Sequence, residues 1–200
     1  MKKSTIYTAA ILSVITLFSC SKDDDTPEII NEEEVISKVV LTLTNNADLE
    51  DIVTYTYEDH DGVGGEAPET TVSGPLSLNS TYKGSIEFHG AHEHEGEEHE
   101  GEEEEEAEDI TSDIKDEGKE HEVFYTFSDD NSGITVTKKS EDDKDINDNP
   151  IGLKPEFKTT NAINTTLTVT LIHLPIKPNT GLESAGGSTD VKTDFNITVQ

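Results

Sequence analysis

Apolar and polar residues alternate with a period of two through most of the sequence from Val35 onward. Neighbouring side chains of a β-strand point to opposite faces, so this period predicts strands with one buried face. Threonine fills many of the opposite positions, as a β-branched polar residue does on a half-buried sheet. The apolar faces of the expected strands are Val39, Leu41, Leu43; Val53, Tyr55, Tyr57; Tyr82, Ile86, Phe88; Val123, Tyr125, Phe127; Ile134, Val136; Leu167, Val169, Leu171; and Val191, Phe195, Ile197, Val199.

Turns rich in Gly, Asn, Asp and Pro separate these short strands. The pattern predicts an all-β domain, an antiparallel β-sandwich of immunoglobulin-like type. One short helix is expected, because Ala107, Ile110 and Ile114 follow helical spacing and Gly118 can end it. No long helical pattern alternates with the strands, which argues against a doubly wound α/β fold.

Residues 1–19 have the pattern of a signal peptide, with the basic pair Lys2-Lys3 before a short apolar stretch, residues 6–18. The stretch is too short to span a bilayer. It ends in "LFSC", which resembles the lipobox of bacterial lipoproteins. That resemblance implies cleavage before Cys20 and lipid attachment to it, so that acyl chains anchor the domain in a lipid membrane. The alternative is an ordinary signal peptide with a chance cysteine at its end.

Residues 20–34 are expected to form an acidic tether. Its start, "SKDDD", resembles the tag that directs lipoproteins of Bacteroidota to the outer face of the outer membrane, which implies a location at the cell exterior. Such a composition also gives a disordered tether without any targeting role. Cys20 is the single cysteine of the chain, so lipidation leaves no thiol for a disulfide, a metal ligand or a nucleophile.

The remaining residues, 35–200, suffice for one domain with one core. The formal net charge of the chain is −30, and the sequence contains no arginine. Phosphate binding needs Lys and Arg, so nucleic acid is excluded as a partner. The negative field attracts cations instead.

An insert at residues 89–120 separates the strand that ends at Phe88 from the strand that begins at Val123. It carries few apolar groups, so we expect it to project into solvent as a loop and the short helix. Loops of this length are uncommon in compact domains and are usually either functional or disordered.

Four of the seven histidines of the chain lie in residues 89–99. Imidazole suits zinc, copper and nickel, and a tetrahedral zinc needs about four ligands. The loop therefore predicts a site for zinc, or for copper or nickel, with a solvated acidic loop as the alternative. The predicted imidazole ligands are His89, His92, His94 and His99, with Glu93, Glu95, Glu97 and Glu98 as substitute ligands or hydrogen-bond acceptors.

The same loop resembles the histidine- and acid-rich loops of bacterial zinc-uptake proteins, although their solute-binding fold is absent here. That resemblance implies a role in gathering ions near a tighter site. Acidic neighbours favour protonated imidazole, which does not bind metal, so we expect binding to be lost as the pH falls. A loop that must order to bind also predicts weak to moderate affinity.

Calcium is the alternative ion, with candidate ligands in two acidic turns. These are Asp59 and Asp61 in the first turn, and Asp143, Asp145 and Asn147 in the second. Hairpin turns rich in Asn and Asp have the same composition without a metal. Of the remaining histidines, His173 is interpreted as a partly buried structural residue, and the role of His121 at a strand border stays open.

Enzymatic activity is not expected. No cysteine nucleophile remains, and neither a G-x-S-x-G nor an H-E-x-x-H motif occurs. A glycosidase carboxylate pair stays open on composition alone. However, a small threonine-rich sandwich without tryptophan has no signal for a sugar cleft.

Segments across most of residues 32–200 resemble a family of small single-domain surface lipoproteins of flavobacteria and their relatives. They are "EEEVISKVVLTLT", "DHDGVGG", "LSLNSTYKGSIEF", "DNPIGL" and "AGGSTDVKTDFNITVQ". Most members of this family have no assigned activity, so the resemblance implies a surface-anchored β-sandwich and little about its chemistry.

Together these features predict a noncatalytic, surface-anchored lipoprotein that gathers a divalent transition metal, zinc first, through the insert. A TonB-dependent outer-membrane importer is the partner that this compartment suggests. The alternative prediction is a protein- or glycan-binding module stabilised by calcium, in which the insert is a solubilising spacer.

Overall fold

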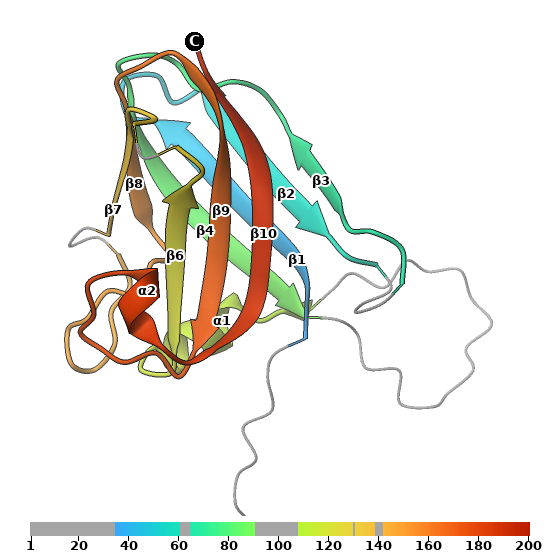
Figure 1. Cartoon of the computed structure of the whole chain (residues 1–200), viewed down its shortest axis with the longest axis vertical. Coiled ribbons are helices and arrows are strands. Elements are labelled where there is room, and N and C mark those ends of the chain that lie inside the picture. The colour runs from blue at the N-terminus through green and yellow to red at the C-terminus, as the bar shows by residue number, and fades with distance from the viewer. Residues whose placement is uncertain (1–34, 61–64, 91–107, 130, 139–141) are drawn as a thin grey trace, which may run out of the picture. The chain divides into compact units, whose positions relative to one another are not determined.

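The computed structural model of the chain describes residues 35–60, 65–90, 108–129, 131–138 and 142–200. These residues form two β-sheets that face each other, with two short helices towards one end of the sandwich (Figure 1). All strand pairings within the two sheets are antiparallel. The antiparallel β-sandwich expected from the period-two pattern is therefore confirmed.

The larger sheet has the strand order β3-β2-β1-β4-β8-β7, and β5 pairs with the end of β4. Its strands are β1 (Ile36–Asn45), β2 (Ile52–Glu58), β3 (Glu69–Val72), β4 (Thr81–Gly90), β5 (Glu108–Asp109), β7 (Ile134–Lys138) and β8 (Pro155–Thr159). The smaller sheet has the order β10-β9-β6 and consists of β6 (His121–Phe127), β9 (Ile163–His173) and β10 (Ser188–Val199).

The core lies between the two sheets and is built from the predicted apolar faces. Leu41 of β1, Phe88 of β4 and Val169 of β9 are fully buried. Across the two sheets, the rings of Tyr55 and Phe195 meet edge to face, with their centroids 5.7 Å apart. Burial of such apolar surface contributes about 25 cal/mol per Å², so this interior is the main source of stability.

Backbone hydrogen bonds outside the regular ladders tie both edges of the smaller sheet to the rest of the domain. On the β10 side, the Leu76 amide donates to the Thr198 carbonyl at 2.8 Å, and the Gln200 amide donates to the Leu76 carbonyl at 3.0 Å. On the β6 side, the Val123 amide donates to the Ile151 carbonyl at 2.8 Å. These bonds satisfy edge groups that would otherwise be open to pairing with another chain.

The helix α1 (Thr111–Asp116) begins close to the position expected from the sequence. Ile110 and Ile114 are buried in the main core, and the Ile110 amide donates to the Phe88 carbonyl at 3.0 Å. The expectation that the whole insert projects into solvent is therefore wrong for its last part. Two apolar side chains at helical spacing are enough to hold this segment against the sandwich.

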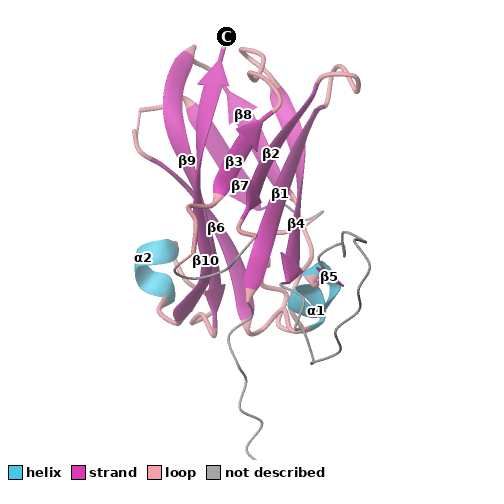
Figure 2. Ribbon diagram, turned by 90° about the vertical axis from the view of Figure 1, so that its right-hand side faces the viewer, coloured by secondary structure: helices cyan, strands magenta, loops and turns pink. Residues whose placement is uncertain are grey.

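A second short helix, α2 (Leu182–Ala185), lies against the outer face of the smaller sheet (Figure 2). There Phe124, Ile172 and Ala185 form a small apolar cluster, with Leu182 packed against it. This cluster covers the face of β6 and β9 that turns away from the main core. No helix in the described part of the chain has both the length and the apolar character needed to cross a bilayer.

Candidate metal centre

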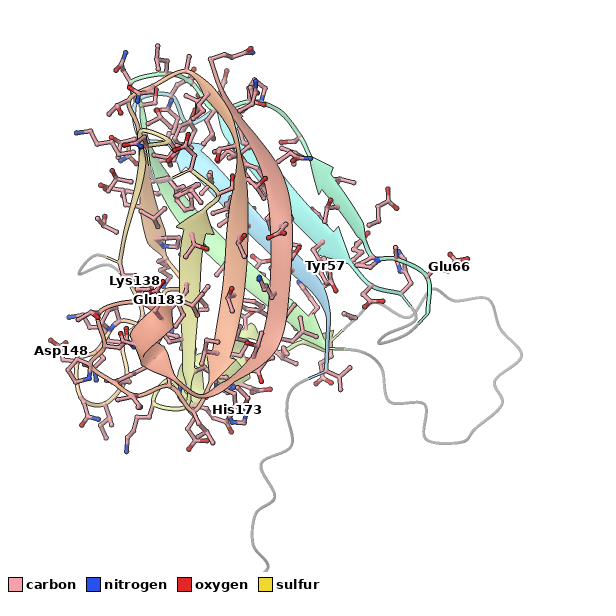
Figure 3. All side chains as sticks on the ribbon, viewed as in Figure 1. Tyr57, Glu66, Lys138, Asp148, His173 and Glu183 are labelled. Atoms are coloured by element: carbon pink, nitrogen blue, oxygen red, sulfur yellow. The ribbon has the colours of Figure 1, made fainter. Side chains whose placement is uncertain are left out.

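Two histidines meet at one end of the smaller sheet. His121 is the first residue of β6 and His173 is the last residue of β9, and the two are directly paired across the strands. His121 shares the core-facing phase with Val123, and His173 shares it with Leu171, because alternate residues of a strand point to the same face. His173 is labelled at this end of the sandwich in Figure 3.

Asp190 joins the pair from β10 through an irregularity in the strand. Ser188 pairs with His173, and the register then shifts between Thr189 and Val191, so Asp190 is an extra residue in the strand. Such a bulge re-aims a side chain that regular pairing would place elsewhere. The Asp190 side chain is completely buried, which places a carboxylate beside the two imidazoles.

The ligand atoms of the three residues lie close together. His121 Nε2 is 3.8 Å from Asp190 Oδ2, and His173 Nδ1 is 3.7 Å from Asp190 Oδ1. One ligand atom from each residue lies within 4.8 Å of the others. Zinc bonds of about 2.0–2.1 Å in a tetrahedron separate the ligand atoms by about 3.3 Å. The ligand atoms must therefore move closer together to hold a tetrahedral ion.

The two imidazole rings are stacked, with centroids 5.1 Å apart and planes inclined by 14°. Nearly parallel rings do not direct their lone pairs at a single point. Binding of one ion by both rings therefore requires at least one of them to rotate. A rotation of about 30° away from a preferred side-chain torsion costs about 0.5–1.5 kcal/mol, which is small compared with the binding energy of a transition metal.

His121 is 1% exposed, and neither of its ring nitrogens has a hydrogen-bond partner within the described residues. Burial, followed by the neighbouring His173, lowers the pKa of His121 to about 4. The imidazole is therefore neutral at neutral pH and keeps a free lone pair, as a metal ligand requires. Its Nδ1 lies 3.9 Å from the Glu117 carboxylate, which is beyond hydrogen-bond distance.

A lysine side chain and a glycine contact the backbone at the ends of β6 and β9. Lys177 Nζ donates to the carbonyl oxygens of Gly118 and His121, at 2.5 and 2.6 Å. Gly187 has a φ of +75°, and a Cβ at this position would collide with the carbonyl oxygen of His173. The backbone before β10 can approach His173 this closely because residue 187 is a glycine.

Most of the ligands predicted in the insert lie outside the described residues. Of them the structure describes His89, which lies opposite Asp109 at the end of β4, with Nε2 4.0 Å from the Glu87 carboxylate. The predicted residues outside the described part of the chain are His92, His94, His99, Glu93, Glu95, Glu97, Glu98, Asp61 and Cys20.

The described calcium candidates contact protein donors. The Asp143 carboxylate lies 3.1 Å from Lys115 Nζ and 3.0 Å from Lys154 Nζ. Asp145 accepts hydrogen bonds from the backbone amides of Asn147 and Asn149, at 2.8 and 2.9 Å. These contacts are typical of a hydrogen-bonded turn.

Asp59 accepts a long hydrogen bond of 3.5 Å from the Tyr57 hydroxyl. Its backbone amide donates to the Ser37 carbonyl at 2.7 Å, just beyond the end of β2. Its backbone therefore extends the pairing of β1 and β2 by one residue beyond Glu58.

Sequence reasoning did not identify the buried cluster, because its three members are far apart in the chain. The sequence nevertheless contains a pattern that indicates burial of the two histidines. His121 and His173 each stand two residues from a core-facing apolar residue, so the alternation places both histidines inside. Asp190 carried no comparable signal, because its position depends on the bulge in β10.

Comparison with models of known protein families, with curated proteins and with solved structures finds no match for this chain. The chemistry of the cluster is that of two imidazoles and one carboxylate. This donor set suits zinc and its neighbours among the transition metals, whereas calcium and magnesium prefer oxygen ligands alone.

Proposed function

We propose that this protein is a surface-anchored, noncatalytic β-sandwich that binds a divalent transition metal, zinc first. The observation that carries the proposal is the buried group of His121, His173 and Asp190, whose ligand atoms lie within 4.8 Å of one another. The neutral state of the His121 imidazole supports binding at neutral pH.

The insert would act as a collector for this site. Its last residues lead directly through α1 into His121, so the predicted histidine-rich loop and the buried cluster share one segment of chain. The net charge of −30 favours accumulation of cations around the domain. Anchoring through Cys20, exposure at the cell exterior and delivery to a TonB-dependent importer complete the proposal, and they rest on the N-terminal sequence alone.

Titration of the purified full-length protein with zinc in a calorimeter tests the proposal. We expect one tighter site, which is lost in His121→Gln and in His173→Gln, and weaker sites that are lost on deletion of residues 91–107. His60→Gln removes an exposed histidine that is not a member of the cluster and is the matched control.

Cobalt is the second probe, because tetrahedral cobalt has a strong visible absorption that octahedral hydrated cobalt lacks. The band should appear with the wild type and the deletion variant, and disappear with His121→Gln. Zinc binding that is the same in the wild type and in a His121→Gln, His173→Gln double variant would remove the buried site from the proposal. Stabilisation by calcium with no effect of zinc would favour the binding-module alternative.

A further inference from the structure

Lys138, Glu122 and Asn179 come together on the side of β6 opposite to the candidate metal centre. Glu122 Oε1 accepts a hydrogen bond from Lys138 Nζ at 2.5 Å. Its second oxygen, Oε2, accepts one from Asn179 Nδ2 at 2.7 Å. A single carboxylate therefore contacts both an amine and a carboxamide, each through one of its two oxygens.

The three residues come from separate parts of the fold. Lys138, labelled in Figure 3, is the last residue of β7 in the larger sheet, and Glu122 lies on β6 in the smaller sheet. Asn179 belongs to the loop between β9 and α2. The two hydrogen bonds of Glu122 therefore connect the two sheets with each other and with the loop between β9 and α2.

The Lys138 side chain is mostly buried, and removal from water opposes the charged form of its amine. The amine lies 4.3 Å from the centre of the Phe124 ring, and the Glu122 side chain beside it is only 8% exposed. Burial lowers the pKa of Lys138, although Glu122 opposes this effect. In a medium of low polarity, transfer of a proton from the ammonium to the carboxylate becomes less costly.

The carboxamide of Asn179 is held in a defined orientation. Its Oδ1 accepts a hydrogen bond from the Gly181 amide at 3.1 Å, and its Nδ2 also donates to the Ile176 carbonyl at 3.0 Å. The Gly181 amide can therefore stabilise negative charge that develops on Oδ1. The leaving nitrogen, in turn, faces the carboxyl group that can protonate it.

We infer that Lys138 and Asn179 condense to an intramolecular amide bond, with Glu122 as the catalytic residue. Glu122 takes a proton from the Lys138 ammonium, and the electron pair of Nζ attacks Asn179 Cγ. Glu122 then gives that proton to Nδ2 and takes the surplus proton from Nζ. The new Nζ–Cγ bond remains, the Cγ–Nδ2 bond breaks, and ammonia leaves. The reaction needs no oxidant or reductant.

This amide bond would be an intramolecular cross-link in a chain that cannot form an intramolecular disulfide. The sequence has one cysteine, so an intramolecular disulfide is excluded. A cross-link between β7 and the loop after β9 restricts the unfolded chain, as a disulfide does. The inference does not depend on metal binding, because the cross-link and the metal centre use different side chains.

Peptide mapping of the denatured full-length protein by mass spectrometry tests the inference. We expect a branched peptide that contains both Lys138 and Asn179, with a mass lower than the sum of its parts by one ammonia. The branched peptide should be absent in Lys138→Arg, Asn179→Ala and Glu122→Gln. It should persist in Lys144→Arg, which changes a lysine that pairs with Asp148 instead.

Two results would overturn the inference. One is a digest of the folded wild type that contains only linear peptides from these regions. The other is loss of ammonia at Asn179 that persists in Lys138→Arg, because that product is a succinimide and not a cross-link. A Glu122→Gln variant that folds, as judged by circular dichroism, and still forms the full cross-link would contradict the role given to Glu122. The wild-type digest decides the question even where a variant fails to fold.

Discussion

His121 and His173 lie directly opposite each other on β6 and β9, with stacked rings 5.1 Å apart and the Asp190 carboxylate beside both. Burial of ionisable groups on the core-facing side of a sheet costs free energy through the loss of hydration. Burial of these three residues at one end of the sandwich therefore lowers the free energy of unfolding of the metal-free protein. A bound cation would offset this loss.

Acidification should destabilise the metal-free protein. The unfolded chain protonates His121 near its ordinary pKa of about 6.5, whereas the folded chain does so only at about 4. Between these values the unfolded state binds more protons, so the free energy of unfolding falls as the pH falls. The loss from this residue is on the order of 3 kcal/mol, and it is complete below about pH 4.

Urea unfolding in the presence of a chelator, at several pH values, measures this dependence. The charged and titratable groups that face His121 are Glu117, Glu120, His173, Asp190 and Lys177. Comparison with His121→Gln isolates the contribution of the imidazole, since the variant should have a flatter profile. Equal slopes in the two proteins would contradict the prediction.

Zinc should raise the melting temperature of the wild type. A ligand that binds only the folded state stabilises it by about 2.7 kcal/mol at a concentration of about 100 times Kd. Asp190→Asn should reduce this gain, because a neutral amide is a poorer ligand for zinc than a carboxylate. Differential scanning fluorimetry with zinc and with calcium checks both statements, and an undiminished zinc effect in Asp190→Asn would exclude Asp190 as a ligand.

Tyr55→Phe should leave stability unchanged or raise it by up to about 1 kcal/mol. The Tyr55 hydroxyl is buried in the core and has no hydrogen-bond partner within the described residues. Burial raises the pKa of this group, which reflects the same lack of solvation. Removal of the oxygen therefore removes a cost without breaking a contact.

Tyr82→Phe is the matched comparison and should cost about 1–3 kcal/mol. The Tyr82 hydroxyl donates to Asp51 at 2.8 Å and accepts from the Ser77 amide at 2.7 Å. Its loss leaves both groups without this partner. Denaturant unfolding of the two variants checks the contrast, and similar free energies of unfolding would argue against it.

Gly187→Ala should destabilise the domain by at least about 2 kcal/mol, through backbone strain and a clash with the His173 carbonyl. Gly74→Ala is the control, because a Cβ there meets no atom within 4 Å and its backbone is not left-handed. Thermal unfolding distinguishes the variants. If both melt like the wild type, the approach of the backbone to His173 is not as close as described.

The local pattern of apolar and polar residues was sufficient to predict most of the strands and α1. Alternation placed Val39, Tyr82 and Phe195 inside, because one face of each strand must be buried. It did not reveal β3, whose four residues are all exposed, or β8, where a proline and a single buried aromatic residue, Phe157, obscure the period. These strands depend on pairing with β2, β4 and β7, which is a tertiary interaction.

The fold class, the acidic character and the content of side chains able to bind a metal could all be predicted before the structure was known, since each follows from the order and kind of neighbouring residues. Which of these side chains meet depends on the tertiary fold. His121, His173 and Asp190 converge because strand pairing and a bulge bring distant segments together, and Lys138, Glu122 and Asn179 converge because two sheets and a loop close on one another. Strand partners and loop closure depend on contacts between segments that are distant in the chain, so no local pattern specifies them.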